Sequence, residues 1–265
     1  MSENSTPIPT QLYIRLAAET LHFARFSASP AFFESASRKV RRDAALAADL
    51  QEAAATMPLL QARIGRTRVL VEAPVCLVPL AEFQEEDCES IYHYCFASEA
   101  PRKVFYDTIP GSGHALLFAL DKPTERAISE TFPEATYTSA ATPLLRHFVR
   151  KSEGQRRIFA SAEGEKMFLA ALDDTKLLSA CYYDIHSPLD AVYYIAYTAR
   201  TFGLDLKKGV PVFVSGDAAT RDSICTALAP YARNAVAVKP SAEFNRHPAA
   251  LDEQMPYDFI TLLTD

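Results

Sequence analysis

Three potential metal ligands lie close together in the sequence, at Cys88, His93 and Cys95. A structural zinc site combines Cys and His ligands, but it needs four of them. In a helix, His93 points away from the two cysteines, and a fourth ligand is not evident. We therefore predict no metal site here, and thiols that lie in the core or at the surface.

The run Gly111-Ser112-Gly113-His114 places a serine between two glycines. A nucleophile elbow requires the order strand, Gly-x-Ser-x-Gly and helix, whereas strand-like runs lie on both sides of this one. Glycines that permit positive φ are typical of a turn. These residues predict a hairpin turn and no catalytic serine.

Gly216 ends the apolar run 210–215, and Asp217 follows it. A glycine at this place permits a tight turn from a strand into a helix. An aspartate just before a helix is a common N-cap. The pair indicates a strand, a turn and a helix, with Asp217 as the N-cap or next to it.

The composition is that of an ordinary globular protein, with 49% hydrophobic and 23% charged residues in 265. This length favours two moderate domains over one. A net charge of −6 gives no support to nucleic acid as a partner. The N-terminus lacks signal-peptide features, and no run approaches the roughly 18 apolar residues of a membrane span. We expect a cytoplasmic protein, and the five scattered cysteines favour reduced thiols.

The first part of the chain predicts alternating strands and helices. Residues 12–26 alternate apolar and polar side chains around a turn at 18–20, which is typical of a hairpin. Further elements are expected as a helix at 46–57, a strand at 68–72, a helix at 82–96, strands at 103–108 and 114–120, a helix at 122–132 capped by Asp121, a strand at Tyr137 and a helix at 143–151. The polar segment 151–157 indicates the boundary between a first domain at 10–152, with a small subdomain at about 102–152, and a second at 153–265.

The second part begins with three strands over 158–185, separated by turn residues. Ser187, Pro188 and Asp190 predict the start of a helix that ends at Gly203. A strand at 210–215, a helix at 220–232, a strand at 235–238 and a tail at 256–260 that packs back on a domain complete the expected order. Tyrosines gather at 182, 183, 193, 194 and 197, where some must be core and the others are either exposed or part of an interface.

This order of elements resembles the actin-like ATPase superfamily of actin, Hsp70 and the sugar kinases. The layout is nearest to the pilus-assembly and cell-division branch and to a family of uncharacterised bacterial proteins with an actin-like ATPase fold. The resemblance implies an α/β, ribonuclease H-like fold with two related domains and mixed sheets around a cleft. Its motifs are altered, because the first Asp-x-Gly becomes Arg15-Leu16-Ala17, the second becomes Ala160-Ser161-Ala162-Glu163-Gly164, and the adenosine Gly-Gly becomes Gly216-Asp217.

The resemblance implies that Arg15, Gly164, Gly216 and Asp217 would be the nucleotide-binding candidates in the interdomain cleft. Backbone N–H groups would cradle phosphate there, and carboxylates would organise magnesium. With Arg15 in place of the acid, that organiser is missing. Arg15 has two interpretations, a ligand for an anion without metal or an arginine on an exposed strand face, which we favour.

Two functions follow as hypotheses. The first is a non-catalytic intracellular scaffold or adaptor, a pseudo-ATPase without catalytic residues, metal or cofactor, that binds a protein partner as a monomer or dimer. The alternative is a nucleotide-binding ATPase or phosphotransfer enzyme that uses ATP and Mg with unusual residues, among them Gly164, Gly216 and an acid such as Asp173 or Asp184.

Overall fold

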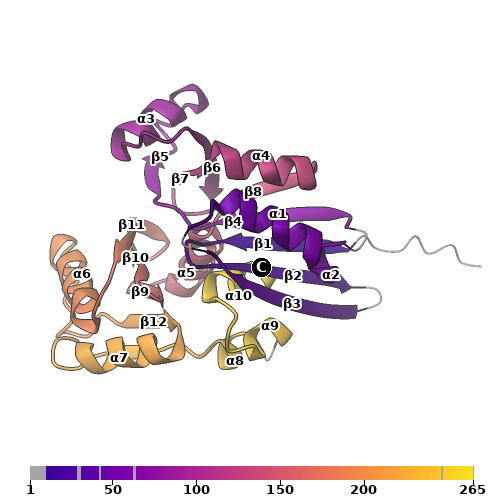
Figure 1. The fold of residues 1–265 in the computed structure, drawn as a ribbon. Helices are drawn as coiled ribbons and strands as arrows, with labels where there is room; N and C mark the ends of the chain where they lie inside the picture. Colours follow the sequence, from indigo (N-terminus) through magenta and orange to yellow (C-terminus); the bar gives the residue numbers. More distant parts are fainter. Residues whose placement is uncertain (1–9, 29–30, 42, 62–63, 246, 265) are drawn as a thin grey trace, which may run out of the picture. The chain divides into compact units, whose positions relative to one another are not determined.

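The computed structural model describes residues 10–264 apart from 29–30, 42, 62–63 and 246. Over these residues the chain is an α/β protein with two five-stranded sheets and one three-stranded sheet (Figure 1). It divides into two compact units. The first comprises the described residues of Met1–Ala73, Ala97–Phe105 and Ala119–Thr138, and the second those of Pro74–Phe96, Tyr106–Phe118 and Ser139–Asp265.

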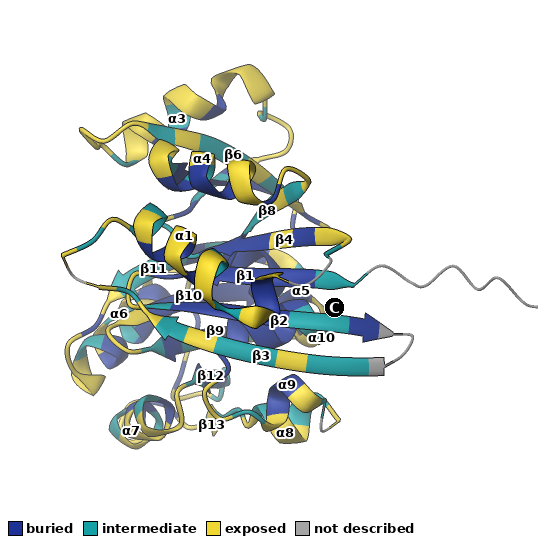
Figure 2. Ribbon diagram, turned by 45° about the vertical axis from the view of Figure 1, so that its right-hand side comes forward, coloured by how far each residue is buried: buried dark blue, intermediate teal, exposed yellow. Residues whose placement is uncertain are grey.

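The sheet of the first unit has the strand order β3-β2-β1-β4-β8. Its strands are β1 (Gln11–Leu16), β2 (Thr20–Ala28), β3 (Ala31–Lys39), β4 (Arg66–Val71) and β8 (Ala135–Ser139). β1 pairs antiparallel with β2, as the hairpin pattern predicted, and parallel with β4. β1 is therefore the middle strand, and Figure 2 shows most of it buried.

Three helices belong to the first unit: α1 (Leu46–Thr56), α2 (Pro58–Gln61) and α4 (Lys122–Thr131). α1 packs against α4. The predicted cap of α4 is confirmed, because Asp121 Oδ1 accepts a hydrogen bond of 2.8 Å from the Thr124 N–H. The strand β3 was not predicted, since its charged end was interpreted as the approach to α1.

A three-stranded sheet has the order β5-β7-β6, formed by β5 (Cys76–Pro79), β6 (Arg102–Ile109) and β7 (His114–Asp121). The predicted hairpin of β6 and β7 is confirmed. The helix expected at 82–96 is shorter, with a 3-10 turn at Glu85–Asp87 followed by α3 (Cys88–Cys95). β6 and β7 each run from one unit into the other.

The sheet of the second unit has the order β11-β10-β9-β12-β13. Its strands are β9 (Arg156–Glu163), β10 (Lys166–Asp173), β11 (Lys176–Asp184), β12 (Val212–Gly216) and β13 (Ala235–Ala237). The three predicted strands form an antiparallel meander, and β12 then pairs parallel with β9. A parallel partner needs a crossover connection, and α6 supplies it.

Helices cover both faces of this sheet. α6 (Pro188–Thr201) and α7 (Ala218–Leu228) bury alternate residues of β9, such as Ile158 and Ala160, in an apolar core. The next residue along, Phe159, faces α5 (Ala141–Ser152) and stacks on Phe148 with ring centroids 4.3 Å apart. Alternate side chains of β9 therefore pack against different helices, on opposite faces of the sheet.

The start of α6 has both hydrogen bonds of a capping box. Ser187 Oγ accepts from the Asp190 N–H at 3.3 Å, and Asp190 Oδ2 accepts from the Ser187 N–H at 2.8 Å. This confirms the predicted helix start. Beyond β13 lie α8 (Pro240–Glu243), α9 (Pro248–Leu251) and α10 (Tyr257–Thr264), of which only the packing of the last was expected. α10 packs on α5.

Residues 139–152 lie in the second unit. The reason is that α5 packs on β9, β10 and α10. Within the described part of the chain, no helix has both the length and the apolar character to cross a membrane.

Candidate functional site

Gly216 is the last residue of β12 and pairs with Ala162 of β9. Its φ is +107°, and a Cβ placed on it would lie 1.7 Å from the Ala162 carbonyl oxygen. No side chain fits at that distance. The next N–H, that of Asp217, donates to the same oxygen at 3.0 Å. Gly216 is therefore required by the close approach of two strands.

The side chain of Asp217 forms a hydrogen bond with the turn that joins β9 to β10. Asp217 stands at the N-cap position of α7, as expected, but its side chain makes no capping bond to the helix backbone. Instead, Asp217 Oδ2 accepts from the Gly164 N–H at 2.8 Å and from Thr220 Oγ1 at 3.3 Å. Three of the four predicted residues, Gly164, Gly216 and Asp217, thus lie together in the second unit.

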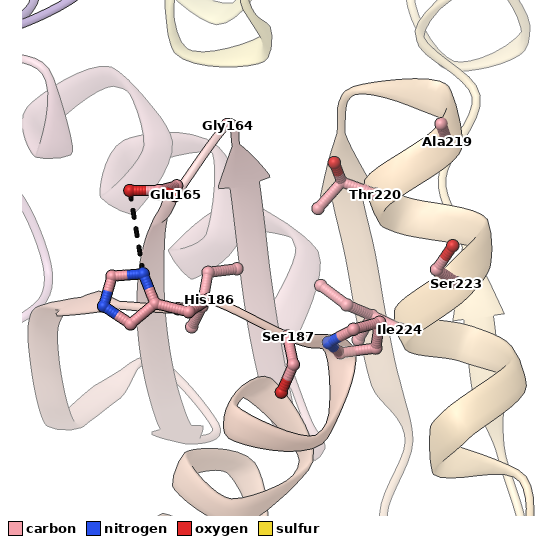
Figure 3. Close-up of a pocket in the computed structure, with 10 residues that line it drawn as sticks. Gly164, Glu165, His186, Ser187, Ala219, Thr220, Ser223 and Ile224 are labelled. Atoms are coloured by element: carbon pink, nitrogen blue, oxygen red, sulfur yellow. Dashed lines mark ion pairs between the residues drawn. The ribbon is translucent and has the colours of Figure 1, made fainter.

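A pocket of about 260 Å³ lies beside this turn. Figure 3 shows Glu165 and His186 on one side of it and Thr220 and Ser223 of α7 on the other. Glu165 Oε2 and His186 Nδ1 are 3.6 Å apart, and both side chains are largely exposed. The pocket is small, and polar side chains lie on both sides of it.

A larger pocket of about 420 Å³ is lined by Gly216. The cations Arg221 and Lys239 line it together with Tyr257 and Met255. Arg221 is buried and donates through Nε to Asp222 at 2.8 Å and through Nη1 to the Val238 carbonyl at 3.2 Å. Asp252 and Glu253 line the pocket as well, so the predicted adenosine turn borders a cavity with two basic and two acidic residues.

Arg15 is in the first unit and is 1% exposed. Its Nη2 donates to Glu72 Oε2 at 2.7 Å, and Glu72 is itself only 12% exposed. The favoured interpretation of Arg15, an arginine on an exposed strand face, is wrong. β1 becomes a middle strand because β4, more than fifty residues later, pairs with its open edge.

The two acids named for the alternative function lie at opposite ends of the meander. Asp173 ends β10 and pairs with Arg156 at 2.9 Å, at the far end of the strand from the Gly164 turn. Asp184 lies at the near end, where it binds Lys166, and this hydrogen bond lowers its pKa. The structure therefore does not bring Asp173 to the turn.

A buried polar cluster joins three helices and was not predicted. Glu243 of α8 accepts hydrogen bonds from Lys151 and from Tyr257 OH, the latter at 2.5 Å, and its Oε1 lies 3.0 Å from His147 Nε2. Burial by itself raises the pKa of Glu243, but the bonds from His147, Lys151 and Tyr257 outweigh it and lower the pKa to about 2. Burial and the Glu243 charge raise the pKa of Tyr257. No local pattern signals such a cluster, because His147 lies 96 residues before Glu243.

All five cysteines are free, which confirms the prediction of unpaired thiols. Cys88 is buried and Cys95 is exposed. Cys76 of β5 lies 3.5 Å from Cys95, sulfur to sulfur. Burial, followed by the neighbouring Cys95, raises the pKa of Cys76 to about 12.

The exposure of Cys95 and the raised pKa of Cys76 predict that an alkylating reagent labels them at different rates. In the native protein at pH 7, a small alkylating reagent is expected to modify Cys95 at least tenfold faster than Cys76, because only the thiolate reacts and Cys76 forms little of it. Peptide mass spectrometry over a time course measures both rates, and the urea-unfolded protein is the control in which they converge. Equal rates in the native protein would contradict the burial and pKa of Cys76.

A family model described as a protein of unknown function, DUF3822, matches residues 3–235. The chain belongs to this family. No curated protein matches it. The DUF3822 match covers most of both units and ends before Lys239, Glu243 and Tyr257.

Two solved structures extend the comparison. One is a protein of unknown function with an actin-like ATPase fold from Bacteroides thetaiotaomicron, at 19% identity and a TM-score of 0.85, with 100% of this chain and 99% of that one covered. The other is from a PilM–PilN type IV pilus biogenesis complex, at 16% identity and a TM-score of 0.56, with 96% and 97% covered. These likenesses show that the DUF3822 chain has the actin-like ATPase fold, as the resemblance implied.

Proposed function

We propose that this DUF3822 chain is a non-catalytic actin-like protein that works in the cytoplasm as a scaffold or adaptor for a protein partner. One observation carries the proposal. In each unit, the group that stands where a phosphate motif would lie already binds a carboxylate: Arg15 binds Glu72, and the Gly164 N–H binds Asp217.

Both contacts are hydrogen bonds to a negatively charged carboxylate, and this charge opposes the binding of a phosphate. A phosphate oxygen would have to displace Glu72 from Arg15 or Asp217 from Gly164, and each carboxylate would repel it. Charge-assisted hydrogen bonds such as these are also about twice as strong as neutral ones. Residue 15 is an arginine, so no carboxylate at this position can organise magnesium. Both the metal and the phosphate therefore lack the ligands that they have in the superfamily motif.

Two further facts support the cytoplasmic adaptor. All five cysteines are free, which is typical of proteins in reducing compartments. PilM, which has a similar fold, is seen in a complex with another protein, PilN. We propose that the present chain likewise acts through a protein that it binds.

Nucleotide titration tests the non-catalytic part. A nucleotide at a hundred times its dissociation constant adds about 2.7 kcal/mol of stability, which raises Tm by roughly 5–10 °C for a domain of this size. We expect no such rise with ATP and magnesium, measured by differential scanning calorimetry. A magnesium-dependent rise in the Tm of the wild-type protein with ATP would contradict the proposal.

The matched variant is Asp217→Ala, which releases the Gly164 N–H. We expect it to lower stability by about 1 kcal/mol through the lost hydrogen bonds. It should still give no ATP response, because Arg15 remains paired and position 15 still lacks an acid. Gain of ATP binding by this variant alone would show that Asp217 is what blocks the phosphate.

The partner is tested by affinity purification of the tagged chain from its native cells, with and without ATP and magnesium. A stoichiometric partner should be recovered equally in both conditions, since we expect no nucleotide-dependent state. Recovery that required ATP would favour a nucleotide-driven switch instead.

A second candidate function is nucleotide binding with unusual residues, favoured by the pocket of about 420 Å³ beside Gly216. Lys239 would meet an anionic group of the ligand there, and Asp252 and Glu253 of the same lining would accept hydrogen bonds from its donors. If any nucleotide raises Tm, Lys239→Ala should abolish the rise, whereas Lys208→Ala, an exposed lysine outside the lining of this pocket, should not.

A further inference from the structure

Helix α6 presents an apolar stripe to solvent. Leu189, Tyr193 and Tyr197 follow one another at intervals of four residues and are 63%, 63% and 57% exposed. Residues four apart lie on the same face of a helix. The opposite face of α6 is occupied by the core residues Val192, Ile195 and Ala199, so the stripe is not needed for the fold.

The two tyrosines of the stripe are already ordered. The rings of Tyr193 and Tyr197 stack at 18° with centroids 6.2 Å apart, and Tyr193 also meets Tyr194 edge to face at 5.3 Å. Tyr194 in turn stacks on Tyr183 of β11 at 4.1 Å. Rings held in this way lose little conformational entropy when they bind a partner. Tyrosine is also enriched in interface hot spots.

Opposite charges lie at the two ends of the stripe. Arg200 stands eleven residues after Leu189, which is three helical turns, and so extends the stripe at its C-terminal end. At the N-terminal end lies Glu165, largely exposed and next to His186, the residue before the Ser187 cap (Figure 3). The surface thus runs from a carboxylate through three apolar side chains to a guanidinium.

When a second copy of α6 lies antiparallel to the first, the acidic end of each stripe faces the basic end of the other. We infer that α6 binds the α6 of a second copy of this chain in antiparallel orientation, with a two-fold axis near Tyr193. Leu189 of each copy then meets Tyr197 of the other, and each Arg200 meets position 186 of the other copy, where Glu165 lies 3.6 Å from His186. A two-fold interface requires that residue i contact j and j contact i, which this spacing satisfies. Antiparallel helices also place opposite dipole ends together.

The expected dimer is weak. A Tyr side chain contributes on the order of 200 Å² when fully buried, and these three residues are about 60% exposed, so two copies together bury roughly 700 Å² through the stripe, which is below the range of stable interfaces. We expect a dissociation constant in the micromolar range. The inference goes beyond the proposed function, and its readout is mass, which nucleotide binding does not affect.

Sedimentation equilibrium of the full chain over a concentration series tests the dimer. The wild-type chain should pass from monomer to dimer, and Tyr193→Ser should weaken the dimer at least tenfold. The control is Tyr231→Ser, which removes a tyrosine that is 50% exposed outside α6 and should leave the dimer unchanged. A wild-type chain that stays monomeric, or a dimer indifferent to Tyr193→Ser, would overturn the inference.

Charge exchange tests the orientation. Arg200→Glu and Glu165→Arg should each weaken the dimer, because like charges then face each other, and the double variant should restore it. The two-fold axis places this pair in the interface twice, which doubles the effect. Both sites are exposed, so circular dichroism should show an unchanged fold. Failure of the double variant to recover association would overturn the antiparallel pairing.

Discussion

Gly216→Ala is expected to destabilise the second unit by about 4 kcal/mol or more. Two costs combine. The first is a φ of +107°, which side chains rarely adopt. The second is that the new methyl group would lie 1.7 Å from the Ala162 carbonyl oxygen, so β12 must separate from β9 or the turn must change. For a unit of this size, the loss corresponds to a fall in Tm of roughly 10 °C or more.

Gly209→Ala is the matched control because it separates the two costs. Gly209 has the same φ of +107°, but the nearest atom to its added Cβ is 3.7 Å away. Only backbone strain remains, and we expect a loss of roughly 1–3 kcal/mol. Calorimetry of both variants measures the difference. If the two variants were equally stable, the close approach of β12 to β9 would not be what requires Gly216.

Glu243→Gln is expected to cost about 3 kcal/mol at pH 7, because it removes the charge that Lys151, His147 and Tyr257 surround. The glutamine amide keeps the shape of the side chain but cannot form the ion pair. α8 and α10 are then held less firmly against α5. Urea unfolding at constant pH measures the loss.

The same carboxylate predicts how stability depends on pH. Its pKa is about 2 in the folded chain against an ordinary value of 4.5. Since the folded pKa is the lower one, the unfolded chain takes up the proton first, and stability falls as the pH falls from about 4.5 towards 2. The contribution is complete above pH 4.5 to 5, and about 2 kcal/mol of it should be gone at pH 3.

The wild-type chain should therefore lose its advantage over Glu243→Gln as the solution is acidified. Asp173→Asn is the control, because Asp173 forms an ion pair with Arg156 in the same unit, with side chains 40% and 55% exposed. Exposed pairs contribute about 0–1 kcal/mol, so this variant should follow the wild-type acid curve. An acid curve of Glu243→Gln parallel to the wild type would show that Glu243 does not carry the low pKa.

Several elements follow directly from local patterns. Ser187, Pro188 and Asp190 predicted the capping box of α6, Asp121 predicted the cap of α4, and the turn residues between 158 and 185 predicted the meander. Each of these signals acts over four to ten residues. β3 and the short helices α8 and α9 were missed, because long-range packing decides them.

The candidate site was only partly predictable for the same reason. Gly216 and Asp217 were placed correctly at a strand end and a helix start. The hydrogen bond from Gly164 to Asp217 joins residues 53 apart, and it exists only because β12 adds to β9 in a particular register. Arg15, expected at the surface, is buried on the middle strand β1, which pairs with a β4 that comes more than fifty residues later.

The sequence by itself determined the order of elements, the caps, the turns and the altered residues at the phosphate motifs, since these depend on neighbouring side chains and on residue type. The tertiary structure decided what those altered residues do. In the folded chain, Arg15 pairs with Glu72, the Gly164 N–H donates a hydrogen bond to Asp217, and Gly216 packs on Ala162. Contacts of this kind depend on strand pairing and helix packing across tens of residues, and no local pattern specifies them.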